Sequence, residues 1–126
     1  MWKLALAVCG LLWAGGLLQG CSGGGGDLPP KLRSEAAQQR GRALFLNQCA
    51  FCHGVDADGK GLRQNNLSSP PRDFTSPAWR RRVTPDEVFH VIRNGVPGTS
   101  MPPWANLSDD QVWDLTAYLL SVSGSS

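Results

Sequence analysis

"LNQCAFCHG", residues 46–54, holds two cysteines two positions apart, and a histidine directly follows the second. Three kinds of chemistry use such a cluster: a zinc site, a dithiol redox centre and the covalent attachment of haem. Each of them needs something different from the rest of the chain. The remaining residues therefore decide between the three.

The chain gives little support to zinc or to dithiol chemistry. A structural zinc ion takes four ligands, and beyond Cys49, Cys52 and His53 the fourth would be the distant His90. A dithiol centre of the thioredoxin kind sits in a βαβ pattern, and no segment here predicts a strand. Haem attachment needs these three residues at this spacing, because each thiol adds to one vinyl group and the histidine binds the iron. We therefore expect one covalently attached haem c at Cys49 and Cys52, with His53 as an iron ligand, and no zinc.

Calcium is also not expected. The segment "DADGKG", residues 56–61, resembles the start of an EF-hand loop. A loop that begins at Asp56 would have Lys60 at its fifth position and Leu67 at its twelfth, and neither residue supplies the oxygen ligand needed there. We interpret this segment as a turn at the haem edge.

The N-terminal residues indicate export. After Lys3, residues 4–18 run for 15 positions without a charge, which fits a signal peptide and falls short of the roughly 20 residues of a membrane-spanning helix. "LQGC", residues 18–21, resembles the lipobox of bacterial lipoproteins, and this resemblance implies that Cys21 is lipidated. An uncleaved anchor, or ordinary cleavage with Cys21 left as a free thiol, are the alternatives.

The domain boundaries follow from this interpretation. We expect a lipoprotein signal peptide over 1–20, a lipidated N-terminus with a flexible Gly-rich tether over 21–33, and one folded domain over 34–126. The protein would lie on the periplasmic side of a bacterial membrane, held by its lipid, or free in the periplasm. With four cysteines in all, the folded domain keeps only Cys49 and Cys52, which rules out a disulfide framework.

Capping and apolar patterns predict three main helices, over 34–49, 84–95 and 108–122. The last has an apolar stripe of Val112, Leu115, Leu119 and Val122. Their predicted N-terminal caps are Ser34, Thr84 with Glu87, and Ser108 with Gln111. Gly/Pro/Asn-rich loops connect them, so the fold class is all-α.

The second axial ligand of the iron has few candidates in the predicted mature chain: Met101, His90, Lys31 and Lys60. His90 lies in the middle of a predicted helix, as a surface histidine would. Met101 lies in "PGTSMPPW", residues 97–104, where prolines restrict the backbone. We expect Met101 to be the ligand, and a soft thioether opposite a histidine raises the reduction potential.

These features together resemble the class I c-type cytochromes, specifically the small bacterial monohaem proteins. Gly41 and Phe45 match the glycine and the aromatic residue of that family's first helix, and Leu115 and Tyr118 match the Leu-x-x-Tyr of its last helix. "NGVPGTSMPPW", residues 94–104, resembles the loop that carries the distal methionine. The resemblance implies that the first and last helices cross, and that the carbonyl of Pro70 or Pro71 accepts a hydrogen bond from His53.

We therefore expect a one-electron carrier without catalytic activity of its own, which exchanges electrons with larger redox proteins. The alternatives are a haem subunit of a reductase or oxidase complex, and a haem sensor or enzyme whose distal side is open. A basic run, "WRRRV" over 79–83, is interpreted as solvated surface, as a contact to haem propionates or as a docking site for an acidic partner. Nucleic acid is not an expected partner, because basic and acidic residues are nearly balanced, 12 against 10.

Overall fold

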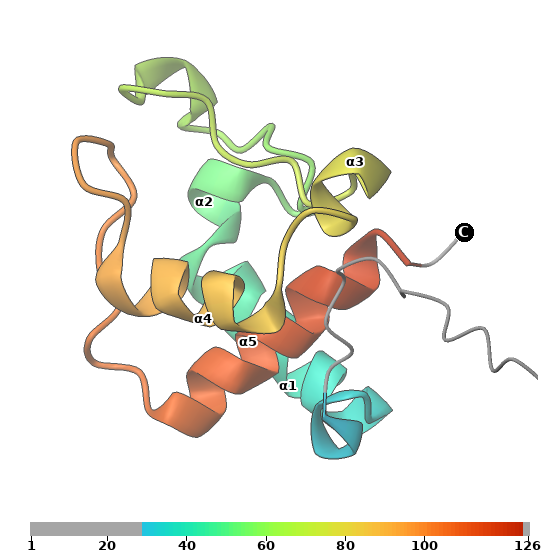
Figure 1. The fold of residues 1–126 in the computed structure, drawn as a ribbon. Coiled ribbons are helices and arrows are strands. Elements are labelled where there is room, and N and C mark those ends of the chain that lie inside the picture. Colours follow the sequence, from blue (N-terminus) through green and yellow to red (C-terminus); the bar gives the residue numbers. More distant parts are fainter. Residues whose placement is uncertain (1–28, 125–126) are drawn as a thin grey trace, which may run out of the picture.

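Two long helices form the base of the fold. The computed structural model describes residues 29–124, in which α1 (Glu35–Gln48) packs against α5 (Asp109–Val122), and α4 (Pro85–Asn94) packs against α5 as well. Figure 1 shows α4 and α5 below the loops, with α1 crossing α5. The described residues contain no strand, so the predicted all-α class is confirmed. The predicted signal peptide and Cys21 lie outside these residues.

The predicted caps all form. Ser34 accepts a hydrogen bond from the Ala37 backbone N–H at the start of α1, which satisfies a donor that has no partner inside the helix. The two later helices begin with reciprocal capping boxes. These boxes join Thr84 with Glu87 in α4, and Ser108 with Gln111 in α5.

Gly41 is the point at which α1 and α5 approach most closely. A Cβ atom at this position would overlap the backbone oxygen of Asp114 and would lie 2.9 Å from Cβ of Tyr118. The side chains around the crossing are buried, among them Phe45 and Leu115, each only 1% exposed. The Phe45 ring packs 5.3 Å from the Tyr118 ring, centroid to centroid. The predicted crossing is confirmed.

Two short helices lie in segments that were predicted as loops. Helix α2 (Ala50–His53) follows α1 after Cys49, and α3 (Pro77–Arg80) begins at Ser76, whose hydroxyl accepts from the Trp79 backbone N–H. Single turns of 3-10 helix occupy Pro30–Leu32 and Gln64–Asn66. Segments this short have too few residues for a periodic apolar pattern to reveal them.

The folded part begins before the predicted boundary. Leu32, which we assigned to the tether, is 6% exposed and belongs to the hydrophobic core. The turn that carries it contacts both α1 and α5. Leu32 therefore packs against the folded domain, although the predicted boundary assigned it to the tether.

Candidate functional site

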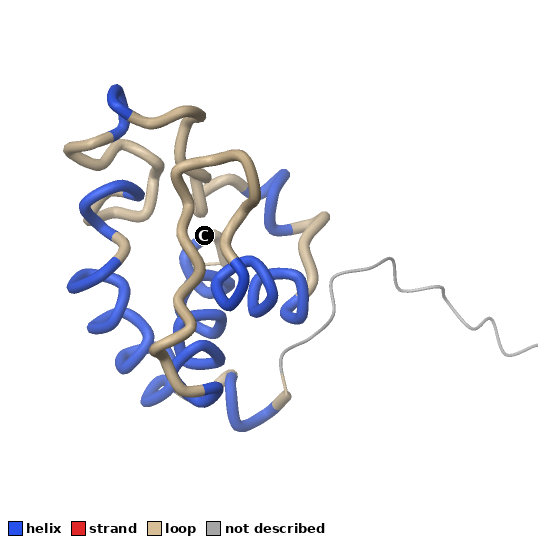
Figure 2. Tube along the Cα trace, turned by 90° about the vertical axis from the view of Figure 1, so that its left-hand side faces the viewer, coloured by secondary structure: helices blue, strands red, loops and turns tan. Residues whose placement is uncertain are grey.

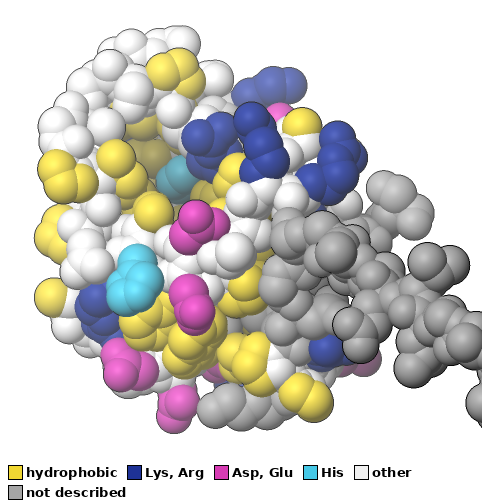
Figure 3. Space-filling view, viewed as in Figure 1, with side chains coloured by type: hydrophobic (Ala, Val, Ile, Leu, Met, Phe, Trp, Pro, Cys, Tyr) yellow, Lys and Arg dark blue, Asp and Glu magenta, His cyan; other side chains and the backbone are white. Residues whose placement is uncertain are grey.

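A cavity of about 350 Å³ lies above the α1–α5 pair. Its wall contains all four residues predicted to hold the haem: Cys49, Cys52, His53 and Met101. In Figure 3 a hollow lined largely by hydrophobic side chains opens on the viewed face. The wall is mostly apolar and includes Phe45, Phe74, Trp79, Val88, Ile92, Trp104, Leu115 and Leu119. A volume of this size is typical of small-molecule and cofactor sites.

The helix α2 holds the cysteine motif, and the loop after it fixes the helix in place. Backbone N–H groups of Gly59, Gly61 and Arg63 donate to the carbonyls of His53, Cys52 and Phe51 respectively, at distances between 2.8 and 3.1 Å. These carbonyls have no partner inside so short a helix, so the loop satisfies them. The loop thereby presents the motif to the cavity in one conformation.

His53 is oriented by a backbone carbonyl, but not by the predicted one. Its Nδ1 lies 3.2 Å from the carbonyl oxygen of Arg72, so the assignment of this acceptor to Pro70 or Pro71 is wrong. A backbone hydrogen bond from the Phe74 N–H to the Ala57 carbonyl holds this segment in place. The carbonyl that faces the imidazole is therefore that of Arg72, one residue after Pro71. Since a carbonyl oxygen only accepts, the proton is on Nδ1, which leaves the lone pair of Nε2 free for a metal.

The titration of the site favours metal ligation over thiolate chemistry. Burial lowers the pKa of His53, and the bond to Arg72 opposes this in part, so the imidazole is neutral. Burial, and to a smaller extent Cys52, raises the pKa of Cys49 to about 12. Dithiol redox centres instead work through a thiol of lowered pKa. Cys49 therefore lacks the lowered pKa of such a centre.

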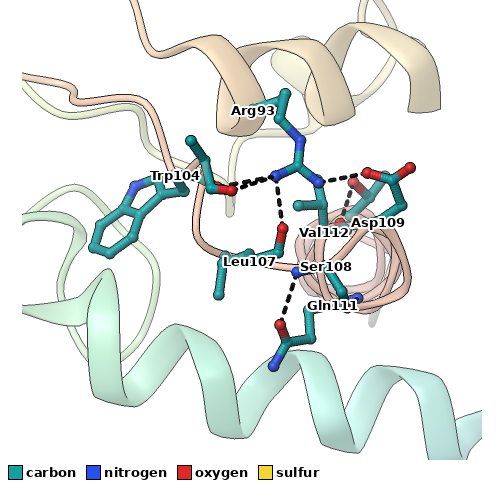
Figure 4. A network of polar contacts seen from close by, with 9 residues as sticks. Arg93, Trp104, Leu107, Ser108, Asp109, Gln111 and Val112 are labelled. Carbon is teal, nitrogen blue, oxygen red and sulfur yellow. Dashed lines mark hydrogen bonds and ion pairs between the residues drawn. The ribbon is translucent and has the colours of Figure 1, made fainter.

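Arg93 fixes the C-terminal end of the loop that carries Met101. From α4 its Nη1 donates to the carbonyls of Trp104 (3.1 Å) and Leu107 (2.6 Å), while Nη2 binds the Asp109 carboxylate at 2.6 Å (Figure 4). The Trp104 N–H donates back to the Ile92 carbonyl at 3.1 Å. Figure 2 turns this loop, which runs between α4 and α5, toward the viewer. One guanidinium thus ties the end of the loop to both flanking helices.

The start of the same loop needs a glycine. Gly95 ends α4 with φ +67°, a conformation that disfavours other residues, and a Cβ there would lie 2.7 Å from the Met101 carbonyl oxygen. That carbonyl accepts from the Val96 N–H at 3.1 Å, and the Met101 N–H donates to the Thr99 hydroxyl at 3.2 Å. Both backbone polar groups of Met101 are therefore held.

Two of the other candidate ligands, His90 and Lys60, lie elsewhere. His90 is exposed on α4 and is not part of the cavity wall, and the Lys60 side chain is 75% exposed and pairs with Asp58 at 3.8 Å. Between residues 29 and 124 no group of three or more His, Cys, Asp or Glu side chains is arranged to hold a metal ion. Sequence reasoning missed Arg72 and Arg93, because a backbone acceptor and a tertiary guanidinium contact leave no local pattern.

Comparison with known proteins now identifies the kind of domain. The family described as cytochrome c oxidase, cbb3-type, subunit III matches residues 36–119. The chain belongs to this family of c-type cytochrome domains. It carries haem c, as predicted, and its role is electron transfer.

The region that matches this chain makes up a different fraction of each relative's length. The chain is 36% identical to the cbb3-type oxidase subunit CcoP of Rubrivivax gelatinosus over 87 residues, which are 67% of this chain and 25% of that one. It is 37% identical to cytochrome c55X of Paracoccus denitrificans, covering 68% of this chain and 74% of the relative. The chain thus spans about a quarter of the length of the oxidase subunit.

A solved structure agrees with this placement. A chain of the Kuenenia stuttgartiensis reducing HAO-like protein complex matches with a TM-score of 0.64 and 32% identity. The match covers 75% of the present chain and 46% of the solved chain. Within the residues described here, no helix has the length and apolar character needed to cross a membrane.

The cavity residues fit haem c. The two thiols lie on the wall with the imidazole and the thioether, and most of the remaining surface is apolar, as a porphyrin requires. Among the described residues, the Nε1 of Trp104 is buried without a hydrogen-bond partner.

The basic run continues beside this cavity. Figure 3 shows Lys and Arg side chains gathered at the edge of the hollow, on the side where Figure 1 places α3. Arg80 and Arg82 donate only to backbone carbonyls, those of Leu120 and Ala78. No carboxylate within the described range pairs with either of them. Their charge is therefore not neutralised by an ion pair among residues 29–124.

Proposed function

We propose that this cytochrome domain carries single electrons through a haem c with His/Met axial ligation. In this proposal Cys49 and Cys52 form the thioethers, His53 is the proximal ligand and Met101 the distal one. The observation that carries the proposal is that all four side chains line one apolar cavity, although Met101 is 48 residues from His53 in sequence.

Each residue has a distinct task in electron transfer. Haem c supplies a reversible one-electron couple. The Arg72 carbonyl holds the tautomer and orientation of His53, and the loop bonds of Met101 present its thioether without a large ordering cost. A thioether on the iron would favour the ferrous state, and the apolar wall would keep water from the iron. With both axial positions filled, no substrate would reach the metal.

A role as one part of a larger oxidase is the second candidate. It is favoured by the oxidase subunits among the relatives, in which the matching region is a quarter to three tenths of the chain. The same haem chemistry would then operate within a fixed assembly. Electron donor and acceptor would in either case be redox proteins.

We also propose that the domain is exported and anchored through lipidated Cys21. The lipobox-like "LQGC" supports this, as does the Gly-rich segment after it. Expression in a lipoprotein-processing bacterium should then give a membrane-bound protein, and Cys21→Ser should release it. An unmodified Cys21 in the mass spectrum of the mature wild-type protein would contradict the anchor.

The electron-carrier proposal is tested by potentiometry together with carbon monoxide. The wild-type holoprotein should titrate as a single reversible one-electron couple, and its ferrous form should react slowly with carbon monoxide. Rapid binding of carbon monoxide by the wild type would instead favour the sensor or enzyme with an open distal side.

A further inference from the structure

The segment that presents Met101 is held to the rest of the domain at few points. Between residues 29 and 124, the stretch 96–103 makes hydrogen bonds outside itself only through the hydroxyl of Ser100. This hydroxyl accepts from the Ser68 N–H at 3.2 Å and lies 3.2 Å from the Ser68 hydroxyl. Both serines are exposed, so water can replace these bonds at little cost. A firmer attachment has to come from the residues that follow Met101.

Arg93 supplies that attachment from α4. Its side chain is only 21% exposed, and its Nη1 donates to the carbonyls of Trp104 at 3.1 Å and Leu107 at 2.6 Å. The Ala105 carbonyl lies 3.5 Å from the same nitrogen. Figure 4 shows this guanidinium between the end of the loop and the start of α5. A guanidinium carries donors on several nitrogens in one plane, which suits several acceptors at once.

Two prolines connect this attachment to the thioether. Pro102 and Pro103 have fixed φ angles, so the backbone between Met101 and Trp104 has few conformations. The Trp104 N–H donates to the Ile92 carbonyl at 3.1 Å, which is a second bond from α4 to the far end of this short spacer. Releasing the bonds at Trp104 should therefore free Met101 to leave the cavity wall.

We propose that Arg93 is a positioning residue that keeps Met101 on the iron in the ferric state. This inference rests on the proposed haem site with His/Met ligation. A thioether is a soft donor, so its bond to ferric iron is weaker than its bond to ferrous iron. Ferric iron therefore depends more on a loop that already holds the sulfur in place. The ferric state is the one in which loss of that hold shows first.

The carbonyl contacts of Arg93 contribute more to this hold than its salt bridge does. The Asp109 carboxylate lies 2.6 Å from Nη2, but the Asp109 side chain is 78% exposed, and exposed ion pairs contribute little to stability. The bonds to the Trp104 and Leu107 carbonyls are partly buried, where an acceptor left without a partner is costly. Substitutions at residues 93 and 109 should therefore differ in their effect on ferric iron.

The test measures how readily imidazole displaces the sulfur from ferric iron in the holoprotein. Arg93→Gln removes the guanidinium, and Arg93→Lys keeps the charge without the planar set of donors. Asp109→Asn removes only the ion pair. Arg40→Gln is the matched control, because Arg40 likewise joins two helices through its guanidinium, but binds Asp114 at the α1–α5 crossing.

We expect both Arg93 variants to bind imidazole about tenfold more tightly than the wild type, as loss of a charged hydrogen bond predicts. Their sulfur-to-iron charge-transfer band should weaken, while the ferrous spectrum stays that of the wild type. Asp109→Asn and Arg40→Gln should change the imidazole affinity by less than about twofold. If Arg93→Gln gives no holoprotein, Arg93→Lys alone decides the result.

A purely structural role for Arg93 gives a different outcome. The Arg93 variants would then unfold at lower denaturant concentration, yet bind imidazole as the wild type does, and this result overturns the inference. A wild type that lacks the charge-transfer band would refute the His/Met ligation itself. The spectrum of the wild type thus separates failure of the proposed haem site from failure of the role assigned to Arg93.

Discussion

At the α1–α5 crossing one backbone lies directly against another, whereas the wall above it is made largely of loops around an open space. The crossing is complete within the chain: Gly41 admits the Asp114 backbone, and Phe45 and Leu115 fill the surrounding volume. The wall leaves about 350 Å³ to be occupied by haem c. The difference shows that one half of the domain is stabilised by its own packing and the other by its cofactor.

This division explains how a domain of roughly 90 residues manages with a small core. Chains near this size bury a limited fraction of their surface and often depend on a cofactor, metal or disulfide. In the part of the chain that the structure describes, neither Cys49 nor Cys52 forms a disulfide. The covalent haem thus takes the stabilising place that a disulfide has in many small domains.

The largest expected effect is on the cavity side. Replacing both Cys49 and Cys52 by Ala should abolish covalent haem and most of the folded holoprotein, because the cavity then loses the group that fills it. Extraction with acid–acetone measures it: haem stays with the wild-type protein and leaves the variant. Phe51→Ala is the matched control, since Phe51 lies between the cysteines and is 57% exposed. Haem retained by the double variant would contradict the assigned attachment.

A large effect is also expected at the crossing. Gly41→Ala should destabilise the domain by about 3 kcal/mol or more, because the new Cβ overlaps the Asp114 backbone and one of the helices must move. Denaturant unfolding of the holoprotein measures the change. Gly124→Ala should stay within about 0.5 kcal/mol, since a Cβ there meets nothing closer than 3.7 Å. Similar stabilities for the two variants would contradict the close helix–helix approach at Gly41.

A smaller effect is expected at the ion pair beside the crossing. Arg40 binds Asp114 through Nε (2.7 Å) and Nη2 (2.8 Å), and the Asp114 side chain is only 10% exposed. Asp114→Asn should cost roughly 1 kcal/mol in the free energy of unfolding, as for a charged hydrogen bond with an exposed partner. Lys60→Gln, which removes an exposed pair of 3.8 Å, serves as the control and should leave stability nearly unchanged. Equal losses in both variants would contradict the importance of burial here.

The smallest effect is expected at the capping boxes. The α4 box contains the carboxyl group of Glu87, which titrates, whereas the α5 box contains the amide of Gln111, which does not. Hydrogen bonds from the Thr84 N–H and hydroxyl lower the pKa of Glu87 below its ordinary value of 4.5. A depressed folded pKa means that this stabilisation is present above 4.5 and is lost as the pH falls through the folded value. The melting temperature of the wild type should therefore exceed that of Glu87→Gln at neutral pH, and the difference should disappear in acid.

The α5 capping box supplies the control for this pH dependence. Gln111→Glu places a carboxyl group at the equivalent position and should introduce the same dependence of the melting temperature on pH. If the difference in melting temperature between the wild type and Glu87→Gln stays constant from neutral to acid pH, the charge of Glu87 contributes nothing to the stability of α4.

The base of the fold was predictable because its signals are local. Residue type and spacing indicate the helix starts at Ser34, Thr84 and Ser108. The 3.6-residue period of the apolar positions then indicates which side of each helix is buried. The crossing at Gly41 came from the family resemblance, since a lone glycine in a helix does not by itself indicate what approaches it.

On the cavity side, sequence reasoning singled out the residues proposed to hold the haem but not the groups that support them. Cys49, Cys52, His53 and Met101 stand out by chemistry, whatever their tertiary placement. The Arg72 carbonyl, in contrast, is a backbone acceptor of no distinctive residue type, and the prediction of Pro70 or Pro71 missed it. Arg93 reaches from α4 to Asp109 across 16 residues.

The most direct test of the account is the optical spectrum of the ferric holoprotein with and without Met101. The wild type should show the sulfur-to-iron charge-transfer band. In Met101→Ala the band should vanish, carbon monoxide should bind the ferrous form readily and the reduction potential should fall, because the ferrous state loses its soft ligand. His90→Ala should change none of these, since His90 is exposed and lies off the cavity wall. A wild type without the band, in which His90→Ala opens the iron, would contradict the assigned ligation.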